Sequence, residues 1–251
     1  MSVEDGVDNK VIESETINNS NEEYWHNTKL ENNLRLPMPT YCLNIKGYCA
    51  KEFGALMVLS NKGIAEDHRF TYRNKFNTTE LAKDLGIGRT GLITNIKKLE
   101  KLECNVLSVE NSNQGVIYKL NYGLMNNNGK LNKYITIQHK MLKELVCSFS
   151  NNAIKLYCVI SFATNENEFT TLTEKWLCEQ IGLNSKSEHN QTTVRTIVKT
   201  LEKCGFIETV TQNAFRWDVK REKQVPFKTK QYRLCSFSEW MDRDSKIECP
   251  Q

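Results

Sequence analysis

A short segment that occurs twice constrains the fold more than any other feature of the sequence. Residues 81–87 read LAKDLGI and residues 177–183 read LCEQIGL, with leucine or isoleucine at three matching positions. Glycine also matches, as Gly86 and Gly182, and each segment is typical of a short helix that ends at its glycine. Such internal similarity indicates two copies of one structural unit.

A second helical pattern follows each copy. It reads RTGLITNIKKLEKL from residue 89 and QTTVRTIVKTLEKCGF from residue 191. Apolar residues recur three and four positions apart in both segments, which predicts one buried face. They are Leu92, Ile96 and Leu99 in the first copy and Val194, Val198 and Leu201 in the second. The second copy has six additional residues, which fall in its polar turn NSKSEHN, where an insertion costs little.

Further elements flank each copy. A further helical pattern precedes each repeated segment, at residues 50–61 in the first copy and 150–165 in the second. Two β-like segments follow it, NVLSVE and VIYKLNYG in the first copy and GFIETVT and KQYRLCSF in the second. The order helix, helix, turn, helix and β-hairpin is that of a winged helix. We therefore predict a mainly α fold with small β-hairpins, made of two tandem winged helix-turn-helix domains.

The same patterns place the domain boundaries. We expect an acidic leader at residues 1–39, domains at 40–126 and 134–237, a linker at 127–133 and a C-terminal tail at 238–251. Capping pairs that begin or lie near the first helix of each copy are Asn77 with Glu80 and Thr171 with Glu174.

The net charge of +4 is unevenly distributed. Residues 1–35 contain eight acidic and three basic residues, a local charge of −5, which leaves +9 on residues 36–251. The leader is poor in apolar residues, so we expect it to be disordered, either as a solvated tail or as an arm that competes with DNA for the basic body. No apolar stretch reaches the ~18–20 residues that span a bilayer, and the N-terminus lacks the features of a signal or transit peptide. A cytoplasmic protein without membrane partners is expected.

The second helix of each copy is the expected DNA-binding element. In a helix-turn-helix, one face of this helix packs on its neighbours and the opposite face enters the major groove. Arginine and lysine can bind guanine, asparagine and glutamine can bind adenine, and threonine can contact phosphate or a thymine methyl group. The same residue types also occur on ordinary solvated helix faces, so the argument depends on both copies together. The candidate residues are Arg89, Thr90, Thr94, Lys97 and Lys101 in the first copy, and Asn190, Gln191, Thr192, Arg195, Thr196, Lys199 and Lys203 in the second.

The connection between the two β-like segments of the second copy is basic. It contains two acidic residues, Asp218 and Glu222, with Trp217 and Phe227 interleaved. A basic wing can follow the phosphate backbone or enter the minor groove, whereas the plain alternative is a mobile charged loop. The matching loop of the first copy, NSNQG, is uncharged, so we expect the second copy to bind the backbone more strongly. The basic residues of the connection are Arg216, Lys220, Arg221, Lys223, Lys228 and Lys230.

Sequence signatures of catalysis and metal binding are lacking. Nine cysteines and four histidines are scattered without zinc-ligand spacing, and no P-loop motif occurs. Residues 86–91, GIGRTG, match the dinucleotide fingerprint G-x-G-x-x-G, but that fingerprint requires a preceding strand, and here a capped helix precedes it. We therefore expect no catalytic residues, no metal and no cofactor.

The repeated segments resemble known families. LAKDLGIGRTGLITNIKKLEKL resembles the helix-turn-helix of winged-helix regulators. KYITIQHKMLKELVCSFSNNAIKLYCVISF, LCEQIGL and TVRTIVKTLEKCGFIE resemble segments of DnaD-type phage replisome organisers. The tandem arrangement is similar to that of the replication initiators of iteron plasmids. These stretches cover most of residues 40–237.

The resemblance implies a plasmid or phage replication initiator that binds repeats in origin DNA and recruits host replication proteins. A transcriptional regulator, such as a repressor, that uses the same two domains is the alternative, ahead of a protein-docking module or an enzyme. One chain with two domains could bind adjacent half-sites alone, whereas a two-fold operator would require a homodimer.

Overall fold

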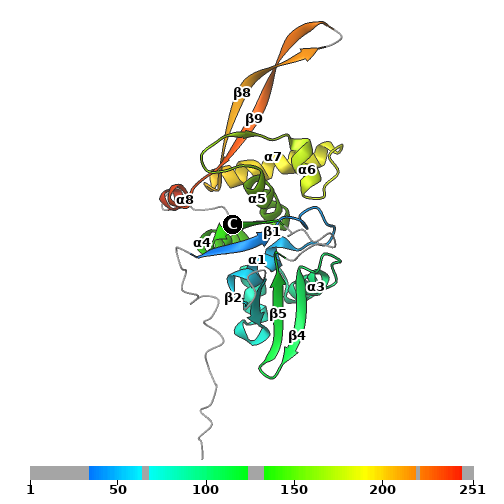
Figure 1. Cartoon of the computed structure of the whole chain (residues 1–251), viewed down its shortest axis with the longest axis vertical. Helices are drawn as coiled ribbons and strands as arrows, with labels where there is room; N and C mark the ends of the chain where they lie inside the picture. Colours follow the sequence, from blue (N-terminus) through cyan, green and yellow to red (C-terminus); the bar gives the residue numbers. More distant parts are fainter. Residues whose placement is uncertain (1–33, 64–67, 124–132, 219–220, 245–251) are drawn as a thin grey trace, which may run out of the picture.

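The computed structural model describes residues 34–63, 68–123, 133–218 and 221–244 (Figure 1). The expected leader up to residue 33 and nearly all of the expected linker lie outside these residues. The fold combines helices with small antiparallel sheets. It has more strand than the expected mainly α fold, chiefly because β8 and β9 are each twelve residues long.

The chain forms two halves that contain similar sets of helices and strands. The first half contains β1 (Arg35–Pro39), α1 (Ala50–Val58), β2 (Asn61–Lys62), β3 (His68–Tyr72), the 3-10 helix η1 (Arg73–Lys75), α2 (Thr78–Asp84), α3 (Arg89–Glu100), β4 (Leu107–Ser112) and β5 (Gly115–Asn121). The second half contains β6 (Tyr134–Gln138), α4 (His139–Ser148), α5 (Asn151–Ala163), β7 (Thr170–Thr171), α6 (Glu174–Gln180), α7 (Glu188–Lys203), β8 (Ile207–Asp218), β9 (Lys223–Leu234) and α8 (Phe237–Asp244).

The two halves repeat one order of elements. The series α1, β3, α2, α3, β4 and β5 recurs as α5, β7, α6, α7, β8 and β9. In both halves the strand that precedes the helix pair bonds to the last strand, so the strand orders are β3-β5-β4 and β7-β9-β8. The internal similarity of the sequence therefore extends to strand pairing. The sequence patterns did not predict β3 and β7. In β3 the buried positions are the polar Arg69 and Thr71, so the segment lacks the apolar alternation of a half-buried strand.

The halves are joined through a shared core. Helix α1 of the first half packs against α4 and α5 of the second half. Gly54 lies at the crossing of α1 and α4, where a β-carbon would stand 2.8 Å from Cγ1 of Val146. The absence of a side chain at Gly54 thus lets the two helices approach closely, and the buried residues of both halves form one cluster.

A two-stranded sheet adds a second joint between the halves. Strand β1 pairs with β6 in antiparallel register, with Leu36 opposite Ile137 and Met38 opposite Ile135. Leu36 and Met38 are fully buried, so strand β1 is part of the packed fold although the expected leader included it, and Arg35 is its one exposed residue. Their partner strand lies about one hundred residues further along the chain, and a local sequence pattern does not reveal such a pairing.

The expected C-terminal tail begins with a docked helix, α8. Trp240 of this helix is 1% exposed and packs on Phe206, with ring centroids 5.5 Å apart. Arg233 of β9 donates hydrogen bonds to Glu208 of β8 and, at 3.0 Å, to Oε1 of Glu239 in α8. A buried aromatic ring and an ion-pair network therefore fix α8 to the second half. Among the helices within the described residues, none is long and apolar enough to cross a membrane.

Replacement of Gly54 tests the joint between the halves. Gly54→Leu should lower the free energy of unfolding by about 1–3 kcal/mol, because the new side chain must displace the stiff Val146. Gly91→Ala is the matched control: Gly91 also lies within a helix, but a β-carbon at this position would have nothing within 4 Å, so a gain of about 0.5–1 kcal/mol is expected. Chemical denaturation measures both. Equal stability of the two variants would contradict the close crossing.

The acid stability of α8 tests its ion-pair network. The hydrogen bond from Arg233, followed by the N–H of Ser236, lowers the pKa of Glu239 from 4.5 to about 2. The depressed value means that Glu239 stabilises the fold fully above pH 4.5 and that this contribution is lost as the pH falls towards 2. Melting temperatures of the wild-type protein and Glu239→Gln should therefore differ above pH 4.5 and converge towards pH 2. A difference in melting temperature that stays constant between pH 4.5 and pH 2 would show that the ion pair of Glu239 with Arg233 does not cause it.

Candidate nucleic-acid interface

Helices α2 and α3 form the first helix pair of the predicted type. Asn77 is the N-cap of α2, as expected from the sequence, and its side chain accepts a hydrogen bond of 2.9 Å from the N–H of Thr79, one residue before the expected partner Glu80. Gly86 has φ +63° in the turn, a conformation that favours glycine, and Gly88 is the N-cap of α3. The glycines of the G-x-G-x-x-G match therefore belong to a turn between two helices and to the start of α3. Helix α2 stands where the fingerprint requires a strand, so the fingerprint geometry is not formed.

The candidate face of α3 is open to solvent. Leu92, Ile96 and Leu99 are buried, as the helical periodicity predicted. On the inner side of the helix, Asn95 donates a hydrogen bond of 2.6 Å to Glu52 of α1, a carboxylate that is 3% exposed. This bond attaches α3 to the shared core. All five candidate residues of the first copy are exposed: Arg89, Thr90, Thr94, Lys97 and Lys101.

Helices α6 and α7 form the second pair. The N-cap of α6 is Thr173, whose side chain accepts from the N–H of Trp176, whereas Thr171 belongs to β7. The predicted capping pair with Thr171 is therefore wrong by two residues, because the short strand extends to that position. Gly182 has φ +78°, and a β-carbon there would lie 2.6 Å from the carbonyl oxygen of Asn44. The turn of the second pair thus packs on the backbone of the first half.

Two candidate residues at the start of α7 bind the inserted turn. The side-chain amide of Asn190 donates to the carbonyl of Asn184 at 3.0 Å, and that of Gln191 donates to the carbonyl of Ser185 at 2.8 Å. Both side chains are partly buried. These bonds use amide donors that adenine recognition would need, so in this conformation Asn190 and Gln191 act first as supports of the turn.

The rest of the α7 face is exposed and basic. Arg195 forms an ion pair with Glu174 at the start of α6, with Nε 2.7 Å from Oε2. The hydroxyl of Thr196 donates to the carbonyl of Thr192 one turn earlier. These contacts orient side chains that remain accessible to solvent. The exposed candidate residues of this face are Thr192, Arg195, Thr196, Lys199 and Lys203.

The basic connection of the second copy is an ordered strand pair. Strands β8 and β9 pair over their whole length, from Ile207 opposite Leu234 to Asp218 opposite Lys223. We call residues 207–234 the ribbon. The prediction of a long loop between short strands is wrong, since the alternation of side chains continues to the tip. Arg221, Lys223 and Lys228 are exposed, whereas Lys220 and the side chain of Arg216 lie outside the described residues.

The sequence pattern placed Trp217 and Phe227 in the basic connection, but Phe215 and its position on the same strand as Trp217 were missed. Phe215 and Trp217 are both exposed, and they lie two residues apart on the same strand. The signal was present as the alternating segment FRW within a strand. It was overlooked because residues 212–229 were read as a connection and not as paired strands.

The structure separates the candidate elements into two groups. Helix α3 and the β4–β5 hairpin belong to the first half, and α7 and the ribbon belong to the second (Figure 1). The two hairpins extend from opposite ends of the long axis of the molecule (Figure 1). The β4–β5 hairpin has an uncharged tip at Asn113 and Gln114, and its Lys119 is paired with Glu110 at 3.8 Å. The second group therefore differs from the first in having exposed basic side chains near the tip of its hairpin.

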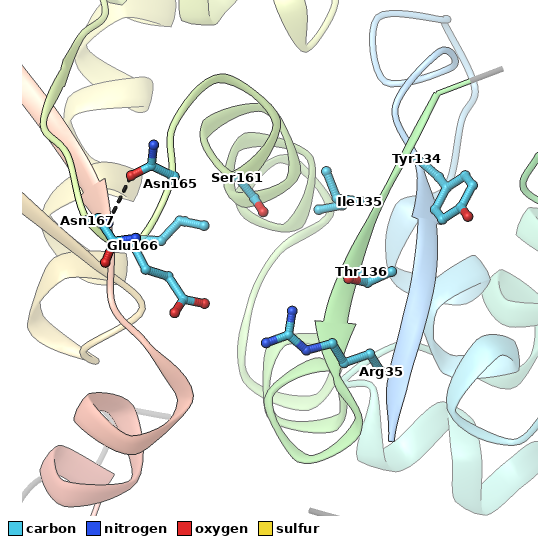
Figure 2. A pocket seen from close by; sticks show the side chains of 9 residues that line it. Arg35, Tyr134, Ile135, Thr136, Ser161, Asn165, Glu166 and Asn167 are labelled. Carbon is cyan, nitrogen blue, oxygen red and sulfur yellow. Dashed lines mark hydrogen bonds between the residues drawn. The ribbon is translucent and has the colours of Figure 1, made fainter. Parts of the chain in front are cut away.

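An open cleft of about 540 Å³ lies between β6 and residues 165–167 (Figure 2). Arg35 and Glu166 are its charged lining residues, and Asn165 accepts a hydrogen bond from the N–H of Asn167. Ser161 also lines the cleft, but no histidine or cysteine lies among the lining residues to serve as base or nucleophile. Over the described parts of the chain, no group of three acidic, histidine or cysteine residues could hold a metal ion.

Comparisons with known proteins add no relative. No protein-family model matches the chain, and no curated protein sequence matches it.

Proposed function

We propose that each half is a winged helix and that the chain binds double-stranded DNA in a sequence-specific manner. The repeated topology supports this proposal, since the series α1, β3, α2, α3, β4 and β5 recurs as α5, β7, α6, α7, β8 and β9 with the same pairing of its three strands. In each half the later helix of the pair has three buried apolar residues and an exposed face with basic residues. An interface of this kind would place α3 and α7 in the major groove.

The side chains of the two helix faces suggest that the two halves make different contributions to DNA binding. In the first half, Arg89 stands at the exposed start of α3, where base edges are usually reached. In the second half, Arg195 and Lys199 are the charged candidates nearest the middle of α7, and Arg221, Lys223 and Lys228 would contact phosphates from the ribbon. The second half therefore supplies more of the electrostatic, salt-dependent part of binding.

The shared core favours an initiator over a regulator of two-fold operators. Because α1 packs on α4 and α5, and β1 pairs with β6, the two DNA-binding faces belong to one packed unit. A single chain would then bind an asymmetric site, and repeated sites would each take one chain. We propose that the protein is a plasmid or phage replication initiator that binds such repeats and recruits host replication proteins. The initiator role rests on the family resemblance of the repeated segments.

Substitutions on α7 test DNA binding by this helix. Arg195→Ala and Lys199→Ala should each weaken binding to the selected duplex by about 1–3 kcal/mol if the residue contacts a base, and by a smaller, salt-sensitive amount if it contacts phosphate. Fluorescence anisotropy at several salt concentrations separates the two cases. Lys62→Ala, which removes an exposed lysine from β2, is the charge-matched control. Unchanged affinity of both α7 variants would show that α7 is not a DNA-binding helix.

The architecture of the bound site tests the proposed role. Footprinting on DNA selected by the protein should show direct repeats, each occupied by one chain, and a plasmid that carries them should depend on the protein for replication. A single palindrome that is bound by a dimer and lies over a promoter, with replication unaffected, would favour the transcriptional regulator instead.

A further inference from the structure

The ribbon carries large aromatic side chains that the fold leaves in solvent. Phe215 is 65% exposed and Trp217 is 61% exposed, and Phe227 on the partner strand is 39% exposed. By contrast, Trp240 of the same half is 1% exposed. Adjacent exposed aromatic residues indicate a binding surface, because a folded protein normally buries or disperses them.

The strand register places Phe215 and Trp217 on one face of the ribbon. Phe215 lies opposite Pro226 and Trp217 lies opposite Gln224, and cross-strand partners share a face. Successive side chains on one face of a strand are roughly 7 Å apart. Phe227 lies opposite Ala214 and therefore belongs to the other face. We call the face with Phe215 and Trp217 the aromatic face.

Positive charge lies on the aromatic face and beside it. Lys228 lies on the same face, two residues beyond Pro226, and Arg221 is exposed near the tip, whereas the exposed Lys223 lies opposite Asp218 and belongs to the other face. Glu222 is the exposed acidic residue of the described tip. A partner with negative charges and flat apolar surfaces fits this combination. Single-stranded nucleic acid has both, since its phosphates are charged and its bases have exposed π-faces.

We propose that the aromatic face binds single-stranded DNA, with Phe215 and Trp217 stacked on unpaired bases. This inference rests on the proposed function, because it gives a DNA-binding protein a second contact with the same nucleic acid. Bases in a duplex are covered by neighbours at a spacing of about 3.4 Å, so side chains roughly 7 Å apart cannot stack on successive bases without unstacking them. An extended single strand presents its bases individually and meets this spacing without that cost.

The position of the ribbon suits this contact. The ribbon projects beyond the helices of the second half at one end of the molecule (Figure 1). Its tip can therefore reach a strand displaced from a duplex that α7 occupies. Phosphate contacts from Lys228 on the same face and from Arg221 near the tip would align the strand, and the two rings would hold its bases.

Binding of the full chain to oligothymidylate of about 12 nucleotides tests the proposal. The double variant Phe215→Ala/Trp217→Ala should bind this probe about 25-fold more weakly or worse, because loss of one stacked base costs about 5- to 150-fold. An abasic oligonucleotide of the same length keeps the phosphates, so both proteins should bind it equally weakly. Phe162→Ala is the control, since it removes a 47% exposed aromatic ring from α5. Melting temperatures check that all variants are folded.

Each outcome of this experiment decides the proposal. Equal affinity of the wild type and the double variant for oligothymidylate, or equal affinity of the wild type for the thymidine and abasic probes, would overturn it. Loss of binding to phosphatidylserine vesicles in the double variant, with no single-strand binding by the wild type, would assign the face to membranes instead. The selected duplex is measured in parallel: failure of the wild type to bind it contradicts the proposed function, whereas retained duplex binding without single-strand binding contradicts the aromatic face alone.

Discussion

The close packing of α1 on α4 is the contact on which the rest of the structure depends. It requires Gly54, because Val146 and Leu142 occupy the space that a side chain would need. The same helix α1 also contacts α5, and β1 extends the contact by pairing with β6. Two small units, each with too little apolar surface for a large core, thereby bury their helices against one another in a single cluster.

This shared core determines how the candidate DNA-binding elements are held. Helix α3 is attached to α1 by packing and by the bond between Asn95 and Glu52, a buried carboxylate. Helix α7 is attached to α5, and the turn before it packs on Asn44 of the first half at Gly182. A path of direct contacts therefore connects α3 with α7. A shift in one half would have to be accommodated by packed neighbours in the other, so the packing couples the positions of α3 and α7.

The second half shows how supporting and recognition roles divide within one helix. Asn190 and Gln191 have the chemistry to bind adenine, yet their amides bind carbonyls of the six-residue insertion. Arg195 is oriented by Glu174, which also holds negative charge near the proposed DNA surface. Lys199, Lys223 and Lys228 keep exposed side chains. The inserted turn thus engages the amides of Asn190 and Gln191, and the ribbon adds exposed basic residues to the same half.

The sequence by itself determined the local structure: the repeated helix pairs, their buried faces, the positive-φ glycines of the turns and the exposure of candidates such as Arg89 and Lys199. These follow from periodicity and backbone sterics within about twenty residues. The tertiary structure alone decided the pairing of β1 with β6, the joint at Gly54, the docking of α8 through Trp240, and the extension of β8 and β9 into the ribbon. Each of these depends on partners far apart in the chain, or on strand pairing that continues past the apolar residues. A pattern read along one segment carries no information about which distant segment will cover it.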